Sequence, residues 1–400
     1  MSIAKAQILS CSKFSFAIVL TSLLIVFSSI HIYDSHAQPI YDQGVLIEFS
    51  FTTGYPGLEQ GITSNLIIGL VNFFKSHDPL TSNALIRILA ASLYLISSSL
   101  LAWALTKRYF LGLEWFTLFI LLIFTSRFPF LWLSSELFAG TFLMLIMWSM
   151  INECPFAITA FFVALFSWAK PDLLIPGLAF GIVLALYDQK EFRNKILSVS
   201  MILLMIVAFV IPGLILKGTS FLELSNRSFQ SFCQHYASMV SSHQIIRPVP
   251  DPWLECQTYT KSTFGNAQKV SEIIVGNGSK YMDFVFLSLS QSLQKMVVSN
   301  LIFLIPLAAT GLWATQHKKI NVAVIFLFFI NFGLIIMLSY FHVRYQARYY
   351  PLALLMAFIG MSERKPKNIQ LFLWGYLLAL LFFQMYQSVP IVNIGYFFID

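Results

Sequence analysis

Charged residues are scarce in this chain, and their scarcity is the strongest constraint on its class. Only 11% of its 400 residues are Asp, Glu, Lys or Arg, whereas 58% are hydrophobic. Soluble globular proteins carry about 25% charged residues, which keep their surfaces solvated. This composition therefore excludes an ordinary soluble domain and favours a protein whose surface contacts lipid.

The sequence signatures of several common enzyme classes are also absent. The chain has no P-loop, no GxSxG and no dinucleotide fingerprint, and its seven histidines show no HExxH or other close metal-ligand spacing. No period of 20–50 residues repeats, which excludes a solenoid. The formal charge of +7 is typical of membrane proteins with Lys- and Arg-rich cytoplasmic loops, so we expect no nucleic-acid partner.

Apolar runs of nearly membrane-crossing length recur along the chain. A hydrocarbon core of about 30 Å needs roughly 20 apolar residues per helix, and on this basis we expect an all-α polytopic membrane protein with about eleven transmembrane helices. The runs lie near 14–32, 84–106, 111–126, 130–151, 155–169, 172–188, 196–216, 298–315, 320–341, 347–362 and 369–387.

The basic residues predict the orientation of these helices. Lys and Arg gather in alternate short loops, which places those loops and the N-terminus in the cytoplasm. We then expect a first transmembrane helix (a signal anchor) at 1–32, a first outer loop with an interfacial helix at 33–83, transmembrane helices two to seven at 84–216, a large outer loop at 217–297 and helices eight to eleven at 298–400. A secretory signal cleaved near Ala37 is the alternative for the first segment.

Two of the four cysteines, Cys233 and Cys256, fall in the large outer loop. Two thiols in one loop on the oxidising side of a membrane are candidates for a disulfide. The alternative is a pair of free thiols in a small loop core.

The first outer loop concentrates acids in a chain that has few. Asp42, in YDQG, follows the first apolar run and could accept a proton from an attacking hydroxyl or coordinate a cation that holds a phosphate. Asp34 competes for this role. Glu59, a further supporting acid, follows the GYPG turn at 54–57 that leads toward a helix. The alternative for each is a solvated loop acid.

Basic groups on the same predicted side could hold a phosphate. Lys170 and Asp172 flank Pro171 between two apolar runs, where they would bind and orient a phosphate or simply snorkel and cap a helix. Arg344 and Arg348 are four residues apart, with Tyr345 between them, and arginine suits bidentate phosphate binding. An interfacial aromatic belt with two snorkelling arginines is the alternative.

Glu136, in SSELFAG, is an ionisable residue inside an apolar run, as is Arg87 in NALIRIL. Such residues are functional candidates, although structural charge pairs are also common. We include Glu136 as a supporting acid.

Taken in order, these stretches resemble the GT-C superfamily of integral-membrane glycosyltransferases, which use polyprenyl-phosphate sugars. The branch with the nearest motifs includes arabinofuranosyltransferases and related bacterial transferases. The matching stretches are YDQG at 41–44, LEQGITSNLI at 58–67, KPD at 170–172 and RYQARYYP at 344–351. The resemblance covers most of 33–351. It implies a bacterial inner-membrane protein with its active site on the periplasmic face.

The resemblance further implies an inverting transferase with Asp42 as general base on the acceptor hydroxyl. Arg344, Arg348 and Lys170 would hold the leaving lipid phosphate. The partners would be a polyprenyl-phosphate-linked sugar donor, a glycan, lipid-linked or protein acceptor, and the bilayer. No cofactor is assigned, and a divalent cation stays an open alternative. The chain departs from the family where Gln43 replaces a second acid and KPDL replaces RPDG.

Two other functions fit the same topology. An outer-face polysaccharide polymerase or ligase would use His235, His243 and Arg247 in the large loop. A transporter or flippase of lipid-linked sugars would place charges near mid-membrane within inverted repeats, and no such repeat is visible.

Overall fold

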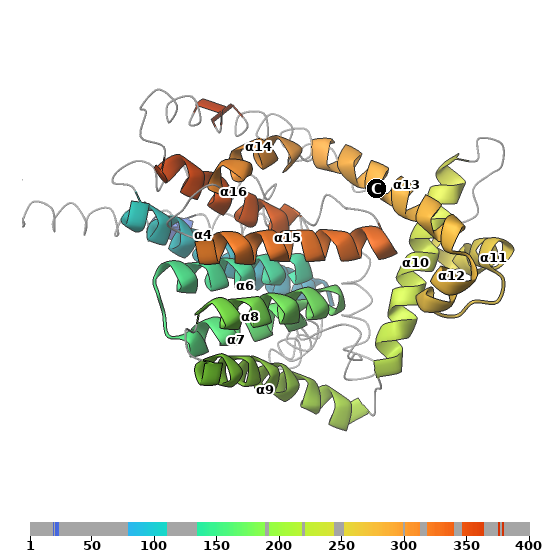
Figure 1. Ribbon diagram of the computed structural model, residues 1–400, viewed down its shortest axis with the longest axis horizontal. Coiled ribbons are helices and arrows are strands. Elements are labelled where there is room, and N and C mark those ends of the chain that lie inside the picture. Colours follow the sequence, from blue (N-terminus) through green and yellow to red (C-terminus); the bar gives the residue numbers. More distant parts are fainter. Residues whose placement is uncertain are drawn as a thin grey trace, which may run out of the picture.

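The protein is helical throughout the part of the chain that the computed structural model describes (Figure 1). This part comprises residues 19, 21–23, 79–109, 134–188, 192–217, 221–243, 252–298, 301–312, 318–339, 346–363, 375–376 and 378–379. No strand occurs among these residues. The expected all-α fold class is therefore confirmed for the described residues.

Apolar helices form a bundle, and a second group of helices forms a lobe at one end of it (Figure 1). The bundle contains α4 (Pro79–Tyr109), α6 (Ser134–Ile151), α7 (Phe156–Ala169), α8 (Leu174–Asp188), α9 (Phe192–Lys217), α14 (Leu301–Leu312), α15 (Lys318–Leu338) and α16 (Gln346–Glu363). The lobe contains α10 (Phe221–His243), α11 (Pro252–Phe264), α12 (Val270–Gly276) and the first half of α13 (Gly278–Val298).

Among the described helices, one is long and apolar enough to cross a membrane, namely Ile88–Lys107 within α4. Gly278–Val297 and Leu301–Gly311 pass the same criterion together, but the chain bends by 90° between them. Five further apolar helices are shorter. The described residues therefore support the helical class and leave the number of spans as a prediction. The predicted runs at 14–32, 111–126 and 369–387 lie almost entirely outside them.

Glycines let several helices of the bundle approach one another closely. Gly177 and Gly181 lie four residues apart on α8 and face α7, where a Cβ on Gly177 would lie 2.8 Å from the Ser167 Cα. On α14, a Cβ on Gly311 would lie 2.9 Å from the carbonyl carbon of Met356 on α16. Small residues four apart are a frequent feature of helix contacts in membranes.

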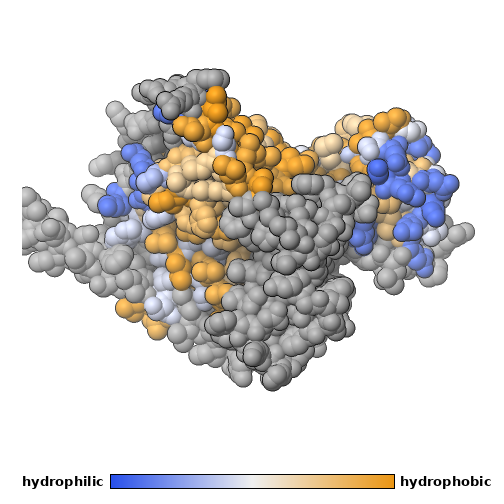
Figure 2. Space-filling model, turned by 90° about the horizontal axis from the view of Figure 1, so that it is seen from below, coloured by the Kyte–Doolittle hydropathy of each residue, from blue (hydrophilic) through white to orange (hydrophobic). Residues whose placement is uncertain are grey.

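The bundle is apolar outside as well as inside. Buried Leu, Phe, Ala and Met side chains from all eight helices form one continuous core. Large apolar side chains are also exposed on its surface, such as Leu204 on α9, which is 69% exposed, and Ile175 on α8. Figure 2 shows hydrophobic residues over the middle of the bundle, and hydrophilic residues on the lobe and at the opposite end of the bundle. Extensive exposed apolar surface is unusual for a soluble monomer.

The lobe has a small aromatic core of its own. Phe232 on α10 lies 4.8 Å from Phe284 on α13 and 5.7 Å from Phe264 on α11, measured between ring centroids. Cys233 and Cys256, the predicted pair, form a disulfide between α10 and α11 with their Cα atoms 5.3 Å apart. The helical lobe is therefore fixed covalently as well as by packing.

Two hydrogen bonds attach α13 to the end of α15. The Tyr281 hydroxyl donates to the Met337 carbonyl oxygen over 2.9 Å, and the Ser288 hydroxyl donates to the Ser339 carbonyl. The lobe is thus joined to the bundle by side chains of α13 as well as by the chain itself.

Candidate functional site

Pro171 determines how the chain passes from α7 to α8. A residue that precedes proline is sterically disfavoured in the helical region, so α7 ends at Ala169 and Lys170 is extended, with φ −149° and ψ 153°. The three residues Pro171–Leu173 then form a single 3₁₀ turn, η3, before α8 begins at Leu174. This turn carries Lys170 and Asp172 at the junction of the two helices.

Glu136 and Arg348 reach the same place from the first turns of two other helices. Glu136 lies in the first turn of α6, where the positive end of the helix dipole favours a carboxylate. Arg348 is the third residue of α16, which packs against α6. Three helix ends that are distant in sequence thus bring four ionisable side chains together.

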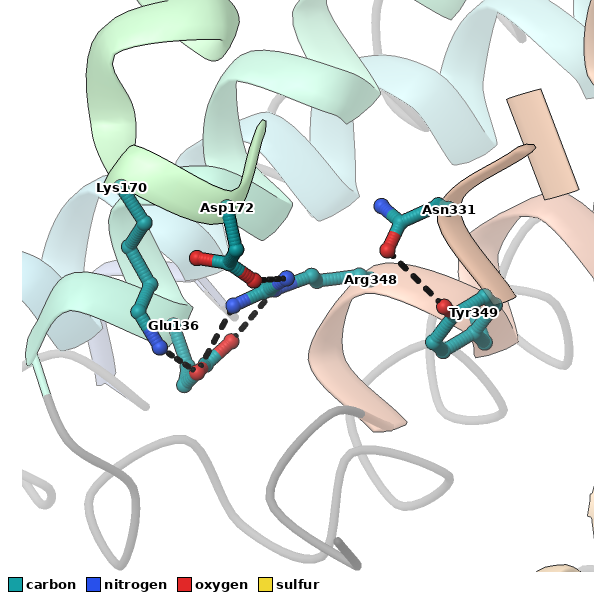
Figure 3. A network of polar contacts seen from close by, with 6 residues as sticks. All are labelled: Glu136, Lys170, Asp172, Asn331, Arg348 and Tyr349. Carbon is teal, nitrogen blue, oxygen red and sulfur yellow. Dashed lines mark hydrogen bonds and ion pairs between the residues drawn. The ribbon is translucent and has the colours of Figure 1, made fainter. Parts of the chain in front are cut away.

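The four side chains form one connected network (Figure 3). The Arg348 guanidinium donates from Nε to Glu136 Oε2 over 2.6 Å and from Nη2 to Glu136 Oε1 over 2.9 Å. Its Nη1 donates to Asp172 Oδ2 over 2.7 Å. The Lys170 ammonium donates to Glu136 Oε1 over 2.5 Å. Arg348 therefore makes two hydrogen bonds to Glu136 and one to Asp172. Lys170 makes a further ion pair with Glu136.

Burial divides this network into two halves. The side chains of Glu136 and Arg348 are 0% and 1% exposed, whereas those of Lys170 and Asp172 are 18% and 37% exposed. Two acids and two bases make the network neutral when all four are ionised. Removing a charge from water costs several kcal/mol, and only close pairing with additional hydrogen bonds compensates that cost. The buried pair is therefore a scaffold that holds Asp172 and Lys170 at the surface of the bundle.

This arrangement refines the role expected of Arg348. A direct contact with a phosphate would require its bonds to Glu136 and Asp172 to open, because the guanidinium is buried and bound to both acids. The geometry instead makes Arg348 a positioning residue for Asp172. Lys170 and Asp172 are the members of the network that solvent, and hence a ligand, can reach.

Neighbouring residues hold the first turn of α16 in place. The hydroxyl of Tyr349 donates to Asn331 Oδ1 on α15 over 3.0 Å, and both side chains are buried (Figure 3). The Tyr349 ring also meets Phe328 edge to face at 5.2 Å. The orientation of Arg348 is consequently fixed from both sides of its helix.

Five further predicted site residues cannot be placed relative to this network because they are not among the described residues. Asp34, Asp42, Glu59, Arg344 and Tyr345 lie outside the described residues. The interfacial helix expected within 33–83 also lies outside them. Within the described residues, no group of three or more His, Cys, Asp and Glu side chains could hold a metal ion.

Two helix contacts in the bundle were not predicted from the sequence. The Tyr349–Asn331 pair was not predicted, because a buried Asn in the middle of an apolar run gives no information about its partner. The Gly177–Gly181 spacing was visible as GLAFG, and it could have predicted the close contact of α8 with a neighbouring helix.

The fold and the site together define a class: an α-helical protein with an apolar surface and a half-buried, neutral network of four charges where three helix ends meet. Comparisons with protein-family models, with curated proteins and with solved structures find no match to this chain.

Proposed function

We propose that this protein is an integral-membrane glycosyltransferase of the GT-C type, which transfers a sugar from a polyprenyl-phosphate donor to a glycan, lipid-linked or protein acceptor. The observation that carries the proposal is the convergence of Glu136, Lys170, Asp172 and Arg348. These residues come from three separate stretches, two of which, KPD and RYQARYYP, carry the resemblance to that superfamily. Their meeting at one place is what a shared site for donor phosphate and acceptor requires.

The surface of the described helices supports the membrane part of the proposal. We place the protein in a bacterial inner membrane with about eleven spans, as the apolar runs predict. Exposed apolar side chains on α8 and α9 suit contact with lipid tails. On α13, Met282, Phe286, Leu293 and Val297 form an exposed apolar stripe along one face. Such a helix suits the boundary between lipid and water.

In the proposed reaction, a hydroxyl oxygen of the acceptor attacks the anomeric carbon of the donor sugar. The bond from that carbon to the phosphate oxygen breaks, and polyprenyl phosphate leaves with the electron pair. Asp42 receives the proton of the hydroxyl as general base. Attack on the face opposite the leaving group inverts the anomeric centre.

The charge network has a separate role in this proposal. Lys170 lies at the surface beside Asp172 and, together with Arg344, would attract the donor phosphate. Arg344 would also supply the bidentate contact for which arginine is suited. Arg348 and Glu136 hold the Lys170–Asp172 turn in place without touching substrate.

The test is transfer of a radiolabelled sugar from synthetic polyprenyl-phosphate donors in proteoliposomes. Asp42→Asn is expected to abolish transfer while insertion and expression stay normal. Lys170→Gln is expected to raise the KM for the donor more than tenfold, because a charge-assisted hydrogen bond contributes roughly 1.5–3 kcal/mol. Lys269→Gln, on the surface of the lobe, is the matched control. Full activity of Asp42→Asn would remove Asp42 from the mechanism.

The polymerase or ligase function would use His235, His243 and Arg247. His235 lies on α10 and is only 5% exposed, so its ring is not presented to a large glycan. Arg247 and the His243 side chain lie outside the described residues, so this alternative stays a prediction for them. The transporter function would appear in the same proteoliposomes as movement of labelled lipid-linked sugar without a glycosylated product.

A further inference from the structure

A cavity lies in the helical lobe, and no residue of the charge network lines it. It has a volume of about 540 Å³ and is open on one side. Its walls are α10 and α11, and the turn after α11 closes one end. Ligand pockets in proteins are typically about 300–1,000 Å³, so the cavity is large enough for a small ligand.

The two helices contribute to the cavity in the same way. On α10 the lining residues are Phe229 and Gln230, followed one turn later by Cys233 and Gln234. On α11 the pattern repeats with Cys256 and Gln257, followed by Thr260 and Lys261. Residues four apart lie on one face of a helix, so each helix turns a single polar face to the cavity. The disulfide holds the two faces together.

Carboxamide side chains dominate the lining. They belong to Gln230, Gln234, Gln257, Asn266 and Gln268. Within the described residues, none of these five amides makes a side-chain hydrogen bond to another part of the protein. Each amide offers two donors on its nitrogen and an acceptor on its oxygen, so the cavity presents donors and acceptors that a ligand can bind without breaking a hydrogen bond within the protein.

This chemistry restricts the class of ligand. A site that binds a phosphate or sulfate group usually contains a cluster of cations. Lys261 is the lone charged residue in the lining, so the cavity does not fit such an anion. A hydrophobic ligand usually binds in a predominantly apolar pocket. Phe229 is the one aromatic residue in this lining, so the cavity does not fit a hydrophobic ligand. A hydroxyl group is both a donor and an acceptor, so a ligand with several neighbouring hydroxyls matches a set of amides.

We propose that this cavity binds a saccharide of one or two residues, with the amides on its hydroxyls and the Phe229 ring against an apolar sugar face. Assignment of that saccharide to the acceptor glycan rests on the glycosyltransferase function proposed above. Binding itself does not depend on that function, because none of the residues of the charge network lines the cavity.

The experiment measures binding of single sugars to the full-length protein in nanodiscs by saturation-transfer NMR. The probes are the methyl glycosides of glucose, mannose, galactose, arabinose, N-acetylglucosamine and glucuronic acid, with empty nanodiscs as the blank. The variant is Gln230→Ala/Gln257→Ala, whose two side chains are exposed and not needed for packing. Gln294→Ala, exposed on α13 and outside the cavity, is the matched control.

At least one glycoside is expected to bind, and the double variant is expected to bind it at least about fivefold more weakly, because two hydrogen bonds of ordinary strength are lost. Gln294→Ala is expected to bind normally. Absence of binding by all six glycosides overturns the proposal, as does unchanged affinity in the double variant. The same binding measurement on Asp42→Asn separates the two proposals. If this variant still transfers sugar and still binds the glycoside, the role of Asp42 is refuted and the cavity assignment stands.

Discussion

Replacing Arg348 with methionine tests whether the charge network holds the bundle together. The substitution preserves much of the side-chain volume but removes three hydrogen bonds, two to Glu136 and one to Asp172. Glu136 then stays fully buried with Lys170 as its remaining partner in the network. Removing one partner of a buried ion pair costs about 3–5 kcal/mol, since it leaves a charge without compensation.

We expect Arg348→Met to lower the free energy of unfolding by about 3–5 kcal/mol. The double variant Glu136→Gln/Arg348→Met removes the buried acid as well as the buried base. Its loss should be smaller than the sum of the two single losses, with a coupling energy of about 1–3 kcal/mol. A suitable assay is equilibrium unfolding in mixed detergent micelles, followed by the fluorescence of the eight tryptophans.

The control for general effects of charge removal is Asp283→Asn. Asp283 is exposed on α13, and its removal should change stability by less than about 0.5 kcal/mol. The reasoning is refuted if Arg348→Met costs under about 1 kcal/mol, or if the losses of the two single variants add up in the double variant. Either result would mean that the four side chains do not stabilise one another.

Two further predictions concern the lobe and the helix contacts. Replacing both Cys233 and Cys256 with serine should destabilise the lobe by about 3 kcal/mol for a bridge across 23 residues, measured as faster hydrogen exchange in α10 and α11 with α4 unchanged. Equal exchange with and without the bridge would contradict this. Gly311→Ala should cost about 1–3 kcal/mol because its methyl group meets the backbone of Met356. Gly333→Ala, with open space around it, is the matched control, and an equal loss in both variants would contradict the packing argument.

Helix positions in the described bundle could be predicted well from the sequence. The apolar runs near 155–169 and 172–188 correspond to α7 at Phe156–Ala169 and α8 at Leu174–Asp188. Hydropathy succeeds here because continuous apolar runs bounded by Pro and charged residues leave few alternatives to a helix. Among the described helices, Ile88–Lys107 alone is long and apolar enough to cross a membrane by itself, so the number of crossings stays a prediction.

The members of the charge network were also predicted, but their arrangement was not. Ionisable residues in or beside apolar runs are functional candidates, and on this basis the sequence predicted Glu136, Lys170, Asp172 and Arg348 as site residues. Topology placed three of them on one side of the membrane, yet it gave no information about which helices are neighbours. The bidentate pairing of Arg348 with Glu136 depends on the contact between α6 and α16. Interactions between segments so distant in sequence are set by the packing of the whole bundle.

No sequence motif predicted the amide-lined cavity. Gln230 and Gln234 share one face of α10, and Gln257 lies on α11, but exposed glutamines are common on any solvated helix. These glutamines line a cavity because the disulfide holds the polar face of α11 opposite that of α10.

The long sequence separation within the charge network has a consequence for biosynthesis. Arg348 follows Glu136 by 212 residues and Asp172 by 176. At about 5–20 residues per second, the ribosome makes Arg348 roughly 10–40 s after Glu136. During this interval the two acids outnumber the one lysine, so the nascent chain carries an uncompensated negative charge at the junction of α6, α7 and α8. Arrival of α16 is therefore the step that completes the charge network, and the acids on α6 and at the α7–α8 junction are not fully paired before it.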